Sequence, residues 1–111
     1  MHEYGVALEI AEMAMKSAGG RNIIKISINN GDLSGVNSES LAMYCDLVFR
    51  EKQNNAVAVA VKRVPARFKC ACGALYAPRK LFDPCPSCKG FDRAVAGGDR
   101  CALESIEVED G

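Results

Sequence analysis

The sequence predicts an α+β fold in which two amphipathic helices and three strands form one unit, interrupted near its end by a small metal-held segment. Two observations lead to this prediction. Apolar residues recur at helical spacing in two stretches and alternate in three others. Between the last two strands the composition changes to cysteine, proline, glycine, arginine and lysine, with little apolar periodicity. A chain of 111 residues is one ordinary domain or two very small ones, and a very small domain needs a metal or another cross-link.

The first predicted element is an amphipathic helix near the N-terminus. Its apolar positions lie three or four residues apart: Val6, Ala7, Ile10, Met13 and Ala14. The glycine pair after Ala18 ends this helix. Isoleucines at positions 24, 26 and 28 then alternate as in a strand, which turns at residues 30–32 (NGD).

A second amphipathic helix follows, capped by Asn37 or Ser38. Its apolar positions are Leu41, Tyr44, Cys45 and Val48, which makes Cys45 a packed core residue. Residues 56–64 (AVAVAVKRV) predict a strand covered on both faces, which Pro65 ends. In residues 101–108 the apolar side chains fall on one side, so this strand is expected to return to the first sheet.

Four of the six cysteines form two close pairs in the segment KCACGALYAPRKLFDPCPSCKG: Cys70, Cys72, Cys85 and Cys88. Zinc takes four tetrahedral ligands, and two short-spaced pairs supply them from two turns. The first pair has one intervening residue where two are usual. Three alternatives stay open: a three-cysteine site completed by Cys101 or water, a redox pair at Cys85 and Cys88, and free thiols. Because Asp83 is the one carboxylate near the cluster in sequence, the expected zinc is structural.

The N-terminus carries the only histidine of the chain. The amine of Met1, the amide nitrogen of residue 2 and the imidazole of His2 can close two chelate rings around one metal ion. Ni(II) and Cu(II) accept such square-planar nitrogen donors, and Glu3 offers its amide nitrogen or carboxylate as a fourth donor. The competing interpretation is an ordinary exposed histidine near a chain end.

Charge and hydropathy narrow the class of partner. The formal net charge is zero, but residues 62–100 carry +6 and the remainder −6. No signal peptide or membrane span is expected, which predicts a cytoplasmic protein. The chain offers no set of nucleophile and general base and no glycine-rich nucleotide-binding loop, so it is not expected to be an enzyme.

Two rival hypotheses remain. One is a zinc-ribbon adaptor in which His2 has no role. The other is a nucleic-acid-binding module, which is favoured by the aromatic residues that lie among the basic ones: Phe68, Tyr76, Phe82 and Phe91.

Five stretches spread along the chain, MHE, NNGDLSGVNSESL, VKRVPARFKCACG, CPSC and LESIEVED, resemble the hydrogenase nickel-incorporation metallochaperones of the HypA/HybF family. The resemblance implies a nickel-binding α/β domain of two helices and a three-stranded sheet, residues 1–65 and 99–111, with an inserted zinc-ribbon domain, residues 66–98. It also implies nickel binding by Met1, His2 and Glu3, with Ni(II) as transient cargo. Structural Zn(II) would be held by the four clustered cysteines.

The resemblance further implies the partners of a metal carrier. These are a nickel-handling maturation GTPase and the large-subunit precursor of a [NiFe] hydrogenase, and in some organisms the same family also serves urease maturation proteins. Neither nucleic acid nor a membrane is an expected partner. A basic surface around Arg79, Lys80, Lys89 and Arg93 is predicted to dock an acidic face of the client, and the alternative is an ordinary solvated surface. Pro65 and the pair Gly97-Gly98 mark the crossings between the domains, where modest pivoting is expected.

Overall fold

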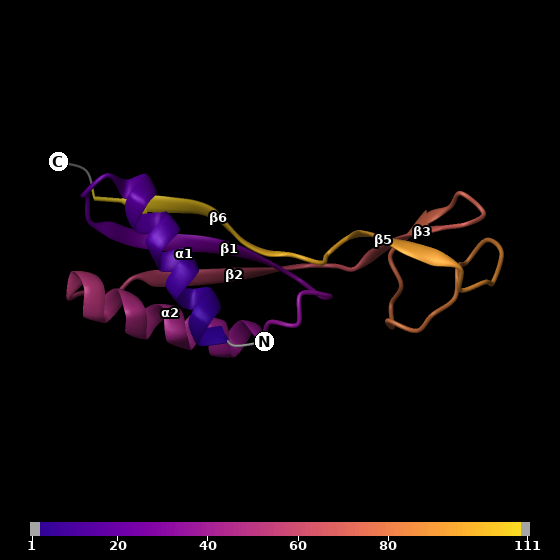
Figure 1. The fold of residues 1–111 in the computed structure, drawn as a ribbon, viewed down its shortest axis with the longest axis horizontal. Coiled ribbons are helices and arrows are strands. Elements are labelled where there is room, and N and C mark those ends of the chain that lie inside the picture. The colour runs from indigo at the N-terminus through magenta and orange to yellow at the C-terminus, as the bar shows by residue number, and fades with distance from the viewer. Residues whose placement is uncertain (1–2, 110–111) are drawn as a thin grey trace.

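The computed structural model describes residues 3–109, which form two helices and two three-stranded sheets (Figure 1). In chain order the elements are α1 (Glu3–Ala18), β1 (Ile23–Gly31), α2 (Ser38–Gln53), β2 (Ala58–Val64), β3 (Arg67–Cys70), β4 (Leu75–Tyr76), β5 (Arg93–Gly97) and β6 (Cys101–Val108). The molecule is elongated, measuring 55 × 25 × 17 Å, because the sheet of β3, β4 and β5 lies beyond the end of the sheet of β1, β2 and β6. The predicted α+β class is confirmed.

Both predicted helices are present, and local chemistry ends each of them. Gly19 follows α1 with a positive φ of 59°, which glycine adopts without strain. The cap of α2 is Asn37, whose side-chain oxygen accepts a hydrogen bond from the N–H of Ser40 at 2.9 Å. Asn54, in the left-handed conformation, ends α2. In the described part of the chain, neither helix has the length and apolar character required to cross a membrane.

The two helices pack on each other and on one face of the first sheet (Figure 1). The core between these layers is fully apolar: Ala7, Ile10, Ala11, Ala14, Ala18, Ile23, Ile26, Ile28, Leu41, Cys45, Val48, Phe49 and Val57. The predicted packing of Cys45 is confirmed, since its side chain has no exposed surface. The placement of Met13 on the apolar face was wrong, because the alanine-rich stripe of α1 faces the core and leaves Met13 55% exposed.

In the first sheet β1 is the central strand, parallel to β2 and antiparallel to β6. Parallel neighbours need a crossover connection, which α2 provides. The prediction that residues 56–64 are covered on both faces was wrong, because the helices cover one face of the sheet and β2 lies at its edge. Val59 and Val61 pack against the core, while Ala58 and Lys62 are exposed. The predicted return of the last strand to this sheet is confirmed.

Two irregularities in the pairing of β1 with β6 explain the apolar spacing of both strands. One lies between Ile23 and Lys25, so Ile23 is buried while Ile24, expected to be on the alternating face, is 42% exposed. The other lies opposite residues 103–105, so Leu103 and Ile106, three residues apart, pack on the same core.

The second sheet has the order β4-β3-β5 and a small core of its own: Ala66, Phe68, Cys70, Tyr76 and Cys85. Two of these five residues belong to the cysteine pairs, so apolar packing alone gives this unit little stability. Of the four aromatic residues that lie among the basic residues, Phe68 and Tyr76 belong to this core, whereas Phe82 and Phe91 are 82% and 62% exposed.

The loop after β1 joins the two sheets. Three of its backbone N–H groups donate to the crossing segments: Gly31 to the Arg100 carbonyl at 2.8 Å, Asp32 to the Val64 carbonyl at 2.9 Å and Leu33 to the Gly98 carbonyl at 2.7 Å. The side chain of Leu33 packs against the second core. Gly98 has a φ of +77°, and a Cβ there would lie 2.5 Å from the Pro65 carbonyl oxygen. Gly98 therefore allows close packing between backbone segments at this crossing.

Candidate metal centres

The structure brings all four clustered cysteines together at the far end of the second sheet. Their Sγ atoms lie within 4.8 Å of one another, and among residues 3–109 no histidine or carboxylate joins the group. Cys70 is the last residue of β3, and Cys72 follows in the turn to β4. Cys85 and Cys88 lie in the turn that follows the loop of residues 77–84.

The first cysteine pair, Cys70 and Cys72, has only one intervening residue and reaches the cluster because its turn is tight. The N–H of Gly73 donates to the carbonyl of Cys70 at 2.9 Å, and Gly73 has a φ of +96°. The N–H of Cys70 in turn donates to the carbonyl of Ala74 at 2.9 Å. A single intervening residue therefore suffices for Cys70 and Cys72 to present their sulfur atoms to the same point.

The second pair lies in a turn whose N–H groups act on the sulfur atoms. The N–H of Gly90 lies 3.4 Å from the Sγ of Cys88. Backbone N–H groups, chiefly that of Cys88, lower the pKa of the Cys85 thiol to about 6, against the effect of its burial. The Gly90 N–H also favours the thiolate of Cys88, but the thiol of Cys70, burial and the remaining cysteines outweigh it and raise the pKa of Cys88 to about 11. The crowded thiols therefore lose their protons at different pH values, and a bound cation displaces the protons that remain.

The sulfur positions fit a tetrahedral ion. A Zn–S bond of about 2.3 Å places the sulfur atoms of a Zn(Cys)4 site about 3.8 Å apart. Two of the six separations here are 3.4 Å, between Cys70 and Cys88, and 3.7 Å, between Cys72 and Cys85, and all six lie within 4.8 Å. The alternative ligand Cys101 lies in β6 and packs against the first core, so it does not belong to the cluster.

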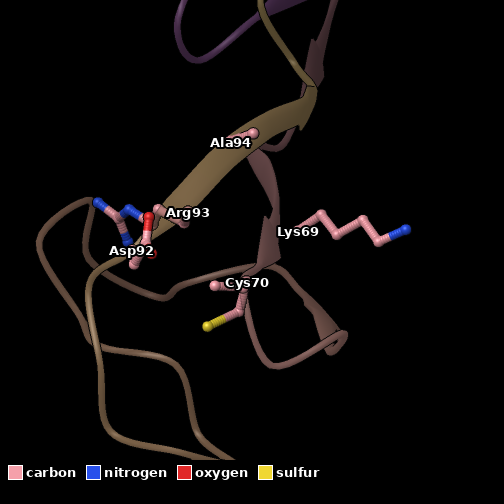
Figure 2. A pocket seen from close by; sticks show the side chains of 6 residues that line it. Lys69, Cys70, Asp92, Arg93 and Ala94 are labelled. Atoms are coloured by element: carbon pink, nitrogen blue, oxygen red, sulfur yellow. The ribbon is translucent and has the colours of Figure 1, made fainter.

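An open hollow of about 390 Å³ lies beside Cys70, between β3 and β5 (Figure 2). Figure 2 shows Lys69 extending to one side of its strand, while the sulfur of Cys70 points to the opposite side. This opposition follows from the alternation of side chains along a strand. The hollow therefore borders the cysteine cluster and is part of its surroundings.

Arg93 stabilises the second unit from within. Its guanidinium donates to the Tyr76 hydroxyl at 3.0 Å, the Asp83 carbonyl at 2.9 Å and the Leu81 carbonyl at 2.7 Å. The guanidinium carbon also lies 4.0 Å from the centre of the Phe68 ring. Arg93, predicted as part of a basic docking surface, is half-buried and has these partners within the unit, and the docking role stays a prediction. The other three basic residues of that prediction are exposed.

Of the predicted nickel-binding residues, Met1 and His2 lie outside the described residues. Glu3 begins α1, and its carboxylate accepts a hydrogen bond from the N–H of Asn37 at 3.5 Å. Tyr4 meets Tyr44 of α2 edge to face, with ring centres 5.6 Å apart. The first turn of α1 is thus attached to the start of α2, a contact that the sequence analysis missed.

A buried asparagine holds the loop that presents Asn37. The side-chain amide of Asn30, 5% exposed, donates to the Val36 carbonyl at 2.9 Å and the Ser38 hydroxyl at 2.8 Å. Its oxygen accepts from the Ser34 hydroxyl at 2.5 Å. The stretch NNGDLSGVNSES therefore contains a satisfied polar network that fixes the N-terminal end of α2.

Comparison with known proteins identifies relatives over the full length of the chain. Residues 1–108 match the family described as "Hydrogenase/urease nickel incorporation, metallochaperone, hypA". The hydrogenase maturation factor HypA of Geobacter metallireducens is 33% identical over 110 residues, which cover 98% of this chain and all of the relative. The protein of the same name from Methanocella arvoryzae is 31% identical over 113 residues, covering 98% and 99% of the two chains.

Solved structures share the fold. The solution structure of the Ni metallochaperone HypA from Helicobacter pylori matches with a TM-score of 0.66 and 20% identity, covering 97% of both chains. A second solution structure of a HypA protein matches with a TM-score of 0.63 over 98% of this chain and 97% of the other, at 19% identity.

Proposed function

The chain belongs to the HypA family of nickel-incorporation metallochaperones in hydrogenase maturation, and on this premise we propose that it binds Ni(II) at its N-terminal residues and delivers the ion together with a partner GTPase. The proposed donors are the amine of Met1, the imidazole of His2 and backbone nitrogen of residues 2 and 3. The chain then acts as a metal carrier and not as a catalyst.

One contact supports backbone rather than carboxylate donation by Glu3. Its carboxylate lies at the N-terminal end of α2, where the N–H of Asn37 donates to it and the helix dipole favours a negative charge. The N–H of Glu3 itself is at the start of α1, where backbone donors have no acceptor within the helix. When Ni(II) replaces this proton on the amide nitrogen and the proton passes to solvent, no helical hydrogen bond is broken.

We further propose that the four clustered cysteines hold a structural Zn(II) ion. Cys70, Cys72, Cys85 and Cys88 provide the thiolate set that zinc prefers, and four protein ligands leave no position for a substrate. When bound, the ion cross-links the two cysteine-bearing turns and so stabilises the second unit, whose apolar core is small.

A carrier must also release its cargo to a recipient. We propose a nickel-handling maturation GTPase and the large-subunit precursor of a [NiFe] hydrogenase as partners, because the family description names hydrogenase and urease as its recipients. Complementation of a strain lacking its own copy of this chain tests the recipient. Restored hydrogenase activity without restored urease activity identifies the hydrogenase branch, and the reverse result identifies the urease branch.

The decisive experiment is a nickel titration of the untagged chain with its native N-terminus. Loose metal is first removed and the tightly held zinc counted, and Ni(II) binding is then followed by calorimetry and absorption spectroscopy. We expect one zinc and one nickel per chain, with nickel binding abolished by His2→Ala and by one glycine added before Met1. Repeating the calorimetry in buffers of different ionisation enthalpy should reveal proton release, because amide nitrogen must deprotonate to bind.

Two matched variants separate the donors. Glu3→Gln should keep nickel binding if the donor is the backbone nitrogen, whereas loss of binding would assign the carboxylate instead. Glu12→Gln removes a carboxylate from the exposed face of the same helix and serves as the charge control. Nickel binding that is indifferent to His2 would reject the N-terminal site and leave the zinc-ribbon adaptor as the explanation.

A further inference from the structure

A tight turn of the second unit exposes two large apolar side chains. The turn spans residues 80–83, and we call it the Leu81–Phe82 turn. Leu81 is 42% exposed and Phe82 is 82% exposed, the largest exposed fraction among the large apolar side chains of the described residues. Isolated apolar residues on a surface need no explanation, but two adjacent ones beside basic residues are typical of a protein contact.

The backbone of this turn is fixed by hydrogen bonds. The N–H of Asp83 donates to the Lys80 carbonyl at 2.9 Å, and the N–H of Lys80 donates to the Asp83 carboxylate at 3.1 Å. The guanidinium of Arg93 donates to the carbonyls of Leu81 and Asp83. Since these hydrogen bonds hold the turn, it is preorganised, and little ordering entropy is lost when a partner contacts Phe82.

A groove of about 270 Å³ borders the turn at the junction with the first sheet. We call it the junction groove, and its lining residues are Asp32, Arg63, Ala66, Pro78, Arg79 and Leu81. Arg63 is already neutralised by Asp32. Arg79 makes no ion pair with any residue from 3 to 109, so its charge is available to a ligand.

We propose that the junction groove and the Leu81–Phe82 turn bind an acidic segment of a partner protein that carries an apolar side chain between its carboxylates. Arg79 pairs with a carboxylate, and the apolar side chain contacts Leu81 and Phe82. The formal charge of +6 on residues 62–100 favours an acidic partner. This inference rests on the proposed carrier function for its biological purpose, because a carrier must dock on a recipient.

A protein segment fits this surface better than a nucleic acid does. The guanidinium of Arg63 in the groove is paired with Asp32, so Arg79 is the one lining residue whose positive charge has no ion-pair partner among residues 3–109. The groove therefore offers a ligand one available guanidinium, that of Arg79, whereas nucleic-acid binding depends on a row of phosphate contacts. A mixture of arginine and exposed apolar residues is instead typical of protein hot spots.

The test is an NMR titration of the zinc-loaded full-length chain, labelled with ¹⁵N, with the peptide acetyl-Glu-Asp-Leu-Glu-Asp-amide. We expect saturable shifts at the amides of Ala66, Arg79 and Phe82 with a dissociation constant of about 1 mM or lower. Arg79→Glu and Phe82→Ala should each weaken binding about five-fold. The matched controls Lys69→Glu and Leu75→Ala alter an exposed lysine and an exposed leucine outside the groove and should leave the affinity unchanged.

Three further probes decide the chemistry. A peptide with glycine in place of leucine, a peptide with glutamine and asparagine in place of the acids, and an oligothymidylate should all bind more weakly at physiological ionic strength. Equal binding of either altered peptide, tighter binding of the oligonucleotide at the same amides, or no saturable shift there would overturn the proposal. Nickel titration of the Arg79→Glu protein keeps the two proposals apart, since this variant should lose peptide binding and retain nickel binding.

Discussion

The carboxylate of Asp32 and the guanidinium of Arg63 form a two-point ion pair across the junction of the two sheets, with N–O distances of 2.7 and 2.6 Å. Asp32 follows β1 and Arg63 is near the end of β2, so the pair ties the loop after the central strand to the edge strand. The same carboxylate accepts a third hydrogen bond, from the N–H of Ala66 at 3.4 Å, where the chain enters the second unit. The pair therefore contributes to the orientation of that unit.

Replacement of Asp32 by asparagine should destabilise the chain in a pH-dependent manner. Hydrogen bonding to Arg63 holds the pKa of the Asp32 carboxyl below its ordinary value of 3.8. Because the folded-state pKa is lowered, the stabilisation is present above that ordinary value and is lost as the pH falls below it. We expect Asp32→Asn to lower the Tm by about 2–6 °C at pH 7. Calorimetry should show this difference shrinking below about pH 4, and a constant difference would contradict the ionic origin.

Gly98→Ala should be among the most damaging single changes in the chain. A Cβ at this position would lie 2.5 Å from the Pro65 carbonyl oxygen and 2.7 Å from the Ala66 Cα, and the φ of +77° adds strain. We expect a loss of about 3 kcal/mol in the free energy of unfolding, measured with urea. Gly5→Ala is the control, since no atom lies within 4 Å of its Cβ position in α1 and alanine should stabilise by about 0.5–1 kcal/mol.

Removal of the proposed zinc should unfold the second unit and spare the first. The core of the second unit contains only five buried residues, whereas the first has thirteen among the described residues. Metal binding in small zinc modules supplies on the order of 10–16 kcal/mol, so chelation removes the main stabilising interaction. In ¹⁵N spectra the amides of Phe68 and Val95 should lose their dispersion, while those of Ile26 and Leu41 keep it. Cys85→Ser should reproduce the chelated spectrum, and retained dispersion at Phe68 would contradict a structural role for the metal.

Cys45 should behave as an inert core thiol. Burial, with a smaller effect from the nearby Cys101, raises the pKa of the Cys45 thiol from 9.0 to about 11. Its thiolate is therefore scarce at pH 8, and iodoacetamide should modify Cys45 only in denaturant. Cys45→Ala should cost about 1 kcal/mol at pH 7. Since the folded pKa is raised, the wild type loses stability as the pH rises above 9, and the difference from Cys45→Ala should narrow by pH 10.

Sequence patterns predicted the elements well where the spacing of residues close in sequence alone determines which side chains meet. The spacing of Leu41, Cys45 and Val48 predicted the buried face of α2, and all three side chains are buried. The pairwise spacing of the cysteines predicted a cluster that the structure assembles. Both predictions depend on local geometry, in which residues close in sequence meet within one helix or one turn.

Features that depend on pairing between distant strands could not be predicted. The ion pair of Asp32 with Arg63 requires the parallel register in which Gly31 lies opposite Val64, and no local pattern encodes that register. Residues 56–61 (AVAVAV) are apolar at every position, so the sequence of this strand did not indicate that helices cover only one face of the sheet. The partners of Arg93 within the unit, two carbonyls, a hydroxyl and a ring, were not predicted because they carry no sequence signature.

The length of the molecule separates its charges as well as its sheets. The Debye length at physiological salt is about 8 Å, far below the 55 Å long axis. A partner that approaches the basic second unit is therefore screened from the acidic helices, and the reverse holds for a partner at the N-terminal region. Two proteins of opposite charge can dock on the two ends at once without electrostatic competition, which suits the proposed carrier, because its GTPase partner and its recipient can then be bound together.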